Sequence, residues 1–398
     1  VFFRGLVKFR DCRLMKIDVM TKDKDIKTTV PTLRFREFQN DARWIPNKID
    51  HVCKIGNGRD YKHLSAGNIP VYGSGGYMTS VDKFLYDGES VCIGRKGTID
   101  KPIFLTGKFW TVDTLFYTYA FHKCLPKFLY LIFQQINWYK YNEAGGVPSL
   151  LKTTIGNINI FIPNNENEQK KIVDCFSSLD DLINAVADKI ETLKEYKKGL
   201  MQQLFPAEGK TTPAFRFPEF QNKGEWEEST LGDICDMQAG KFVSASEICD
   251  VKKDTMYPCY GGNGLRGYTH SFTHFGIYPL IGRQGAQCGN ITYAEGKFHA
   301  TEHAVVVTLK KDIDIRWLYY QLIKLDLNQY ATGQAQPGLS VDVIKKVTIR
   351  IPKNKNEQQL IACGLFSVDE LISTETAKLD QLKAHKKGLM QQLFPKLQ

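Results

Sequence analysis

The stretch Lys197 to Pro206 reads KKGLMQQLFP, and the identical stretch returns as Lys386 to Pro395, 189 positions further along a chain of 398 residues. The same offset relates the segment that begins at Ile162-Pro163 to the one that begins at Ile351-Pro352, because both lead into an Asn-Glu-Gln triplet, at 167–169 and 356–358. An internal repeat of this size is far longer than the ~20 to 50 residues of solenoids and propellers. The chain is therefore predicted to be two copies of one unit, each large enough for its own core.

Two glycine-rich stretches also recur, at an offset of 188 residues. The segment 72–76 (YGSGG) is echoed by 260–264 (YGGNG), and the segment 93–97 (IGRKG) by 281–285 (IGRQG). The start of each half matches too, since residues 31–38 resemble residues 213–220. Irregular turns on a rigid scaffold are where recognition residues usually lie.

Each half is predicted to end in a long amphipathic helix. Apolar residues from Ile172 to Leu204 are spaced alternately by four and three positions, and the pattern returns from Ile361 to Leu393 with Glu375 interrupting it. A helix of this kind, roughly 57 Å long, cannot bury its apolar stripe alone. We expect the two helices to pair within the chain as an antiparallel coiled coil; the alternative is that each is an ordinary core helix of its own half.

The rest of each half is predicted to be mixed α/β structure. Residues 117–121 and 304–309 are typical of strands, and 125–139 and 315–325 of short helices, the second capped by Asp314. We expect tandem domains at 31–165 and 207–353, and helical spacers at 166–206 and 354–398. Residues 1–30 are expected to be a loose, disordered tail, or to reflect translation begun upstream of a true start at Met20.

Composition favours a packed globular protein, since hydrophobic residues make up 42% and aromatic residues 12% of the chain. No stretch approaches the ~18 to 20 consecutive apolar residues of a membrane span, and the N-terminal region does not have the pattern of a signal peptide. The ten cysteines include no Cys-x-x-Cys pair, so a disulfide framework is not expected. These features together indicate a cytoplasmic protein.

The formal net charge of +10 is unevenly placed. Residues 31–165 carry 16 basic and 10 acidic side chains, whereas residues 207–353 carry 17 and 16. A basic domain is the electrostatic footprint of a protein that binds the phosphate backbone of nucleic acid, but the excess here is modest. Charge alone leaves nucleic-acid binding undecided.

Sequence signatures of catalysis are absent. There is no Gly-x-x-x-x-Gly-Lys-Ser/Thr, no Gly-x-Ser-x-Gly and no Pro-Pro dipeptide, which disfavours a nucleotide-driven motor, an α/β-hydrolase and an adenine methyltransferase. One group of residues has metal-ligand character: His270, His274, Cys288, His299 and His303. The first half has no histidines at matching positions, and residues 270–274 read as strand or loop, so no metal is expected.

Arginine and glutamine in the repeated turns suit the reading of DNA bases, because arginine can pair with guanine and glutamine with adenine. Flanking glycines would let the backbone approach a groove closely, and the polar residues of the other repeated turn suit phosphates or base edges. The alternative is that these glycines form tight turns in a sheet and the arginines form scaffold salt bridges. The candidates for DNA contact are Tyr72, Ser74, Arg95, Lys96, Tyr260, Asn263, Arg283 and Gln284.

The polar residues of the repeated decapeptide need a separate explanation. Helix packing constrains its apolar residues, but its lysines and glutamines are also identical in the two copies. A protein partner that is met twice would account for this identity, and recent duplication is the alternative. The candidates for a subunit interface are Lys197, Lys198, Gln202, Gln203, Lys386, Lys387, Gln391 and Gln392.

Together these motifs resemble the specificity subunit of type I restriction-modification systems. The resemblance rests on the Ile-Pro segments that lead into Asn-Glu-Gln and on GLMQQLF at 199–205 and 388–394, in order and twice, and it covers residues 31–398. It implies that residues 31–165 and 207–353 are target recognition domains, each of which reads one half of a split, asymmetric DNA sequence. The helices would fix the gap between the half-sites and dock two methyltransferase subunits.

The resemblance also implies a chain that is not catalytic and holds no cofactor. The methyltransferase subunits would supply S-adenosylmethionine, and restriction subunits would use ATP and Mg²⁺ for translocation and cleavage. Double-stranded DNA and these subunits would be the partners, with no membrane. Two other hypotheses stay open: a duplicated scaffold protein without DNA specificity, and a metal-dependent hydrolase built on the histidine group.

Overall fold

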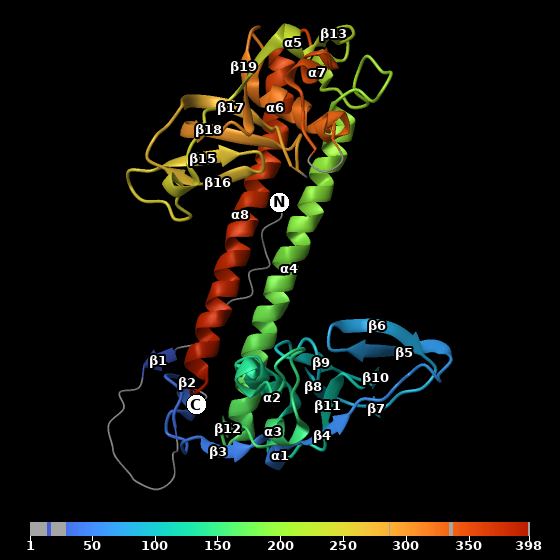
Figure 1. Ribbon diagram of the computed structural model, residues 1–398, viewed down its shortest axis with the longest axis vertical. Helices are drawn as coiled ribbons and strands as arrows, with labels where there is room; N and C mark the ends of the chain where they lie inside the picture. Colours follow the sequence, from blue (N-terminus) through green and yellow to red (C-terminus); the bar gives the residue numbers. More distant parts are fainter. Residues whose placement is uncertain (1–13, 17–28, 286, 334–336, 397–398) are drawn as a thin grey trace. The chain divides into compact units, whose positions relative to one another are not determined.

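The computed structural model describes residues 14–16, 29–285, 287–333 and 337–396, and the chain divides into two compact units. Unit 1 comprises residues 1–186 with 378–398, and unit 2 comprises residues 187–377. Each boundary falls inside one of the two long helices, which are labelled α4 and α8 in Figure 1. Each unit therefore holds one mixed α/β domain, the start of the helix that follows this domain, and the end of the other helix.

The domain of unit 1 contains two four-stranded sheets. Their strand orders are β6-β5-β10-β7 and β4-β11-β8-β9, and β12 pairs antiparallel with β3. The elements are β2 (Leu33–Phe35), β3 (Ile45–Lys48), α1 (Ile49–Val52), β4 (Lys54–Asn57), β5 (Ala66–Gly73), β6 (Gly76–Val81), β7 (Tyr86–Asp87), β8 (Ser90–Gly94), β9 (Ile103–Leu105), β10 (Lys108–Thr111), β11 (Leu115–Tyr119), α2 (Pro126–Phe133), α3 (Lys152–Gly156) and β12 (Asn159–Ile162).

The N-terminal region departs from the expected loose tail at two places. Leu14–Lys16 forms β1, which pairs antiparallel with β2. Thr29 also forms an isolated bridge with Trp44. The rest of the expected tail, residues 1–13 and 17–28, lies outside the described residues.

The domain of unit 2 is organised around one six-stranded sheet. Its strand order is β14-β19-β17-β18-β15-β16, and β13 pairs antiparallel with β20. The elements are β13 (Glu227–Thr230), α5 (Leu231–Ile234), β14 (Cys235–Ala239), β15 (Tyr257–Gly261), β16 (Gly264–Thr269), β17 (His274–Gly282), β18 (Ile291–Ala300), β19 (Ala304–Leu309), α6 (Ile315–Lys324), α7 (Val341–Lys345) and β20 (Thr348–Ile351).

The short elements predicted from sequence are largely present. The strand at 304–309 is β19, and α6 follows the expected Asp314 cap, whose carboxylate accepts hydrogen bonds from the backbone of Arg316 and Trp317. The helix expected over 125–139 was too long, since α2 ends at Phe133. The Phe133 carbonyl at this end accepts a hydrogen bond of 3.0 Å from the Trp138 indole, whose ring packs against the Phe133 ring.

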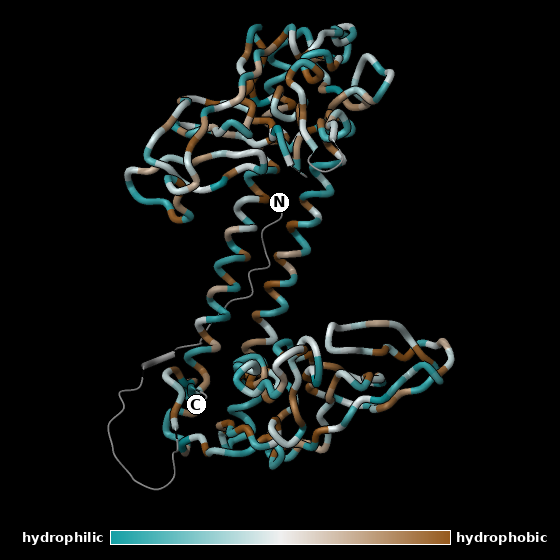
Figure 2. The backbone as a smooth tube through the Cα atoms, viewed as in Figure 1, coloured by the Kyte–Doolittle hydropathy of each residue, from teal (hydrophilic) through white to brown (hydrophobic). Residues whose placement is uncertain are grey.

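The two long helices are α4 (Glu166–Leu204) and α8 (Lys355–Leu393), each of 39 residues. In unit 1, Lys386 of α8 contacts Asp180, while Phe394, which directly follows α8, contacts the earlier residue Phe176 of α4. The helices are thus antiparallel within the unit. Figure 2 shows apolar residues recurring along both helices, but coiled-coil geometry remains a prediction. Among the helices of the described residues, none combines the length and the hydropathy that a membrane span requires.

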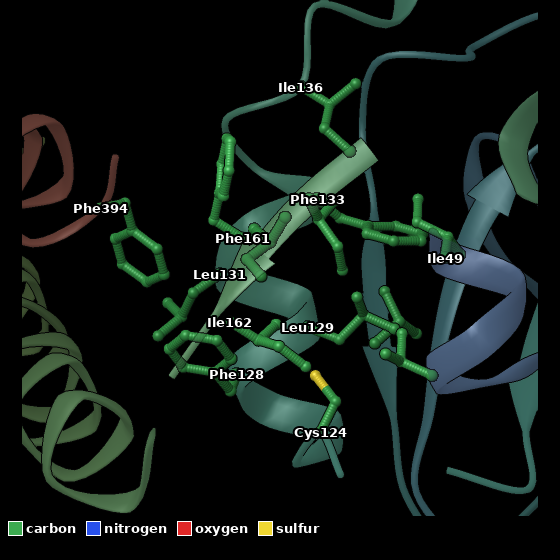
Figure 3. Packing of buried hydrophobic residues seen from close by; sticks show 14 of the residues in the cluster. Ile49, Cys124, Phe128, Leu129, Leu131, Phe133, Ile136, Phe161, Ile162 and Phe394 are labelled. Carbon is green, nitrogen blue, oxygen red and sulfur yellow. The ribbon is translucent and has the colours of Figure 1, made fainter. Parts of the chain in front are cut away.

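The ends of the repeated decapeptides are buried in the cores of the units. In unit 1, the Phe394 ring lies beside Phe128 in the core (Figure 3). The Phe394 ring centroid is 5.4 Å from that of Phe128 and 5.9 Å from that of Trp44. In unit 2, Phe205 packs against Trp226 and Trp317 in the same way. Each long helix therefore starts in the core of its own domain and ends in the core of the other unit, which a core helix of a single half would not do.

The Asn-Glu-Gln triplets form the second repeated anchor. Glu168 accepts two hydrogen bonds of 2.7 Å from Arg34 and one of 3.1 Å from the Trp44 indole, all in the core of unit 1. Glu357 accepts the same three bonds from Arg216 and Trp226 in unit 2. The glutamate at the start of each helix is thus paired and hydrogen-bonded, as a buried carboxylate must be.

Candidate nucleic-acid interface

In the first domain, several loops are hydrogen-bonded to residues 112–115, which form the turn after β10 and the first residue of β11. The Arg95 backbone N–H donates to the Thr114 carbonyl at 2.8 Å, and the Gly58 N–H donates to the Leu115 carbonyl at 3.2 Å. The Val112 N–H donates to the Tyr72 carbonyl at 3.0 Å. Main-chain bonds of this kind fix the backbone whatever side chains the loops carry. The turn therefore holds the loops at 58–60, 72–77 and 95–97 beside one another.

A further loop, residues 145–150, joins this group. Gly97 donates to the Pro148 carbonyl and Leu150 donates to the Arg95 carbonyl, both at 2.9 Å. Gly97 has a φ of +88°, a conformation that glycine adopts readily and other residues avoid. A methyl group built on Gly97 would lie 3.4 Å from Ser74 Oγ, so the two repeated glycine-rich turns are neighbours. We call residues 58–60, 72–77, 95–97, 112–115 and 145–150 the first loop cluster.

The second domain repeats this construction bond for bond. Each of the following backbone hydrogen bonds is named with the residue whose N–H donates before the residue whose carbonyl accepts. They are Arg283 to His303 (2.9 Å), Thr301 to Tyr260 (2.9 Å), Gly240 to Ala304 (3.0 Å), Gly285 to Pro337 (3.0 Å) and Leu339 to Arg283 (2.9 Å). Gly285 has a φ of +93°, close to that of Gly97. We call residues 240–242, 260–264, 283–285, 301–304 and 337–339 the second loop cluster.

The predicted DNA-contact residues all lie in these two clusters, but not all of their side chains are exposed to solvent. Arg95, Lys96, Asn263, Arg283 and Gln284 are exposed, and Ser74 is half-buried. Among the described residues no ion pair includes Arg95, Lys96 or Arg283, which counts against the alternative that they are scaffold salt bridges.

The two tyrosines differ from the other candidates, because their rings support the loops. The Tyr72 ring packs against Tyr77, and the Tyr260 ring lies 5.7 Å from Phe298 within the sheet. Burial raises the pKa of Tyr260. These rings are therefore partly occupied by packing within the domain.

Sequence reasoning placed no DNA-contact candidate in several parts of the clusters, including the central turns at 112–115 and 301–304. Arg59 and Lys241 are exposed next to the glycines that bond to the central turns, and Phe242 is 76% exposed beside Lys241. The loop at 145–150 was also missed as part of a site, although Pro148 and Pro337 are related by the same 189-residue offset as the decapeptides. This shared offset could have identified the loop at 145–150 from the sequence.

The histidines of the group with metal-ligand character in unit 2 are not arranged around a common metal position in the described structure. His299 bonds through its ring nitrogens to Ser271 and to the Lys241 carbonyl, and His274 stacks on Phe298 at 5.4 Å. Burial lowers the pKa of His274. Within the described part of the chain, no group of three His, Cys, Asp or Glu residues is arranged to hold a metal. The hydrolase hypothesis therefore has no geometric basis in these residues.

The subunit-interface candidates separate into two groups. Lys197 binds Asp369 at 2.7 Å in unit 2, and Lys386 binds Asp180 at 2.5 Å in unit 1, so these two lysines join the antiparallel helices within a unit. Tyr320 also donates to Asp369, and burial and this bond raise the pKa of Tyr320. The helix pairing explains why both lysines recur. The candidates that remain exposed are Lys198, Gln202, Gln203, Lys387, Gln391 and Gln392.

Known proteins share this architecture. The family model described as type I restriction modification DNA specificity domain matches residues 42–195 and again residues 223–384. The type I restriction enzyme EcoprrI specificity subunit of Escherichia coli is 38% identical over 165 residues, 41% of this chain and 41% of that protein. The MjaVIII specificity subunit of Methanocaldococcus jannaschii is 27% identical over 346 residues, 78% of this chain and 77% of that protein.

A solved structure has the same fold. The crystal structure of the type I restriction-modification system S subunit from M. genitalium matches with a TM-score of 0.70 at 18% identity, over 93% of this chain and 100% of that chain. The match to the E. coli relative spans less than half of that protein, at 41%. Because the family model covers most of both halves, the chain belongs to the type I restriction-modification DNA specificity family, with one specificity domain in each half.

Proposed function

We propose that the chain is the DNA-reading subunit of a type I restriction-modification complex and that each loop cluster reads one half of a split DNA target. The observation that carries this proposal is the duplicated cluster, in which matched backbone bonds hold exposed Arg95 and Lys96 in one domain and Arg283 and Gln284 in the other. Because the two clusters share a backbone arrangement but carry different side chains, they are suited to binding different DNA sequences. Arginine and glutamine are suited to guanine and adenine in the major groove.

Arg95→Ala is expected to weaken binding of the target duplex by about 1–3 kcal/mol, the contribution of one bidentate base contact. Relaxed discrimination is expected in the first half-site only, because Arg283 remains intact. The measurement is a competition binding assay of the assembled complex, on a duplex carrying the wild-type methylation motif and on duplexes changed in either half. Arg36→Ala is the matched control, since Arg36 is exposed outside the loop clusters. Equal affinities for both variants would contradict the assignment.

The alternative of a scaffold without DNA specificity makes a different prediction in the same assay. A protein that contacts phosphates releases counterions, so its DNA affinity falls steeply with salt concentration. The net positive charge of residues 31–165 supports such contacts by the first domain. A complex with no salt-dependent DNA binding would favour the scaffold.

Two methyltransferase subunits are proposed to dock on the exposed decapeptide residues, one copy on each unit. In unit 1, Lys387 and Gln391 line a groove of about 790 Å³ together with Gln134, Met390 and Phe394. Native mass spectrometry of the co-expressed complex should give two methyltransferase subunits per chain. A complex with none would reject this part of the proposal.

The catalytic steps are proposed to reside on the partners. S-adenosylmethionine would be bound by the methyltransferase subunits, and ATP with Mg²⁺ by the restriction subunits, so this chain would act as a non-catalytic reader. We also propose a cytoplasmic location. The cysteines among the described residues are free thiols, which suits a reducing compartment. Burial raises the pKa of Cys53, Cys92 and Cys235 to about 12, so these thiols stay protonated near neutral pH.

A further inference from the structure

The central turn of each loop cluster carries one acidic residue at the same position. The turns read TVDTL at 111–115 and ATEHA at 300–304, so Asp113 and Glu302 occupy equivalent places. At each of the other four positions the residues differ in kind or size. The acid is therefore the chemical property that the two turns have in common.

Each acid lies beside the arginine of its cluster. The residue after Asp113 accepts the Arg95 backbone N–H at 2.8 Å, and the residue after Glu302 accepts the Arg283 backbone N–H at 2.9 Å. Despite this proximity, neither acid forms an ion pair with its neighbouring arginine in the described part of the chain. Neither carboxylate is therefore paired with the arginine of its own cluster in the described residues.

The two carboxylates have unused hydrogen-bonding capacity. Asp113 is exposed, and no hydrogen bond to its side chain is present among the described residues. Glu302 Oε1 lies 3.2 Å from His303 Nε2, whereas Glu302 Oε2 is buried without a partner in the described structure. A carboxylate oxygen without a donor costs free energy. The Glu302 side chain as a whole is 34% exposed, so rotation of its carboxyl group would present this oxygen to a ligand that supplies a donor.

DNA offers few suitable donors to a carboxylate. Phosphates repel it, and in the major groove the donors are the amino groups of cytosine and adenine. Glutamate and aspartate typically accept from cytosine N4. We propose that Asp113 and Glu302 each accept a hydrogen bond from a base amino group, with cytosine the preferred base, beside the position read by Arg95 or Arg283. This inference rests on the proposed DNA-reading function and names residues that set its specificity.

Glu302→Gln and Asp113→Asn test the inference, because each change keeps the shape of the side chain but gives it a donor. The full chain is co-expressed with its methyltransferase subunits, and methyl-adenine is mapped across host DNA by single-molecule sequencing. Glu302→Gln should reduce discrimination at one base position of the second half-site by about tenfold or more. Asp113→Asn should do the same in the first half-site. The controls are Glu295→Gln and Asp87→Asn, which change exposed acids on strands β18 and β7.

The outcomes separate the inference from the proposed function. An unchanged motif in both acid variants, or an equal loss of methylation at all sequences, would overturn the role of the two acids while leaving the DNA reader intact. A wild-type chain that directs no split motif would overturn the proposed function and this inference together. A melting temperature equal to that of wild type verifies that each variant is folded.

Discussion

Glu168→Ala is expected to destabilise unit 1 by roughly 3–5 kcal/mol, and Glu357→Ala to destabilise unit 2 by a similar amount. Arg34 and Glu168 are only 2% and 1% exposed, so removing the carboxylate leaves a guanidinium buried without its counter-charge. The Trp44 indole loses its acceptor as well. Breaking one partner of a buried pair is costly for this reason, whatever the net contribution of the intact pair.

Denaturant unfolding of the full chain, followed by tryptophan fluorescence, measures this effect. Glu166→Ala is the matched control, because Glu166 is an exposed glutamate in the first turn of the same helix. A surface change of this kind is expected to fall within about 0.5 kcal/mol of wild type. If Glu168→Ala unfolded at the same denaturant concentration as Glu166→Ala, the anchoring role of the triplet would be rejected.

Phe394→Ala is expected to cost about 3–5 kcal/mol, the usual penalty for removing a buried phenylalanine ring. Phe394 is 4% exposed and contacts Trp44, Phe128 and Phe176 in the core of unit 1. Because this ring anchors the last turn of α8, the end of the helix should open more often. Phe205→Ala should have the equivalent effect on the last turn of α4 in unit 2.

Hydrogen exchange measured by mass spectrometry shows which end of which long helix opens more often in each variant. In Phe394→Ala, peptides covering residues 386–394 should lose protection while those covering 197–205 keep it, and Phe205→Ala should show the reverse. Gln392→Ala is the control, since Gln392 is exposed in the same turn. Uniform loss of protection over the whole chain would show that the helix ends are not separate anchors.

The sequence predicted the duplication, the two long helices and the positions of the candidate loops, because these leave periodic or repeated side-chain patterns. It did not predict in which core the last turn of each helix packs. The apolar spacing from Ile172 to Leu204 is the same whether the last turn packs on its own domain or in the core of the other unit. The pairing of Lys197 with Asp369 was equally hidden, since it depends on the register between the helices.

The loop clusters show a second reason for incomplete prediction. Their construction rests on backbone hydrogen bonds, such as that from Arg95 to Thr114, which place no requirement on side-chain identity. Asp113 and Glu302 are therefore surrounded by dissimilar residues, and sequence comparison of the two halves does not single them out. The glycines with positive φ were detectable because that backbone conformation does restrict the residue type.

In the proposed function, this chain selects the DNA sequence that its partner enzyme methylates. The most direct test expresses the chain with its methyltransferase subunits in a host that lacks this methylation, and maps methyl-adenine genome-wide by single-molecule sequencing. We expect one split, asymmetric motif, methylated on both strands, which disappears when the chain is omitted. A stable complex that adds no methylation, or a motif that persists without the chain, would contradict the claim.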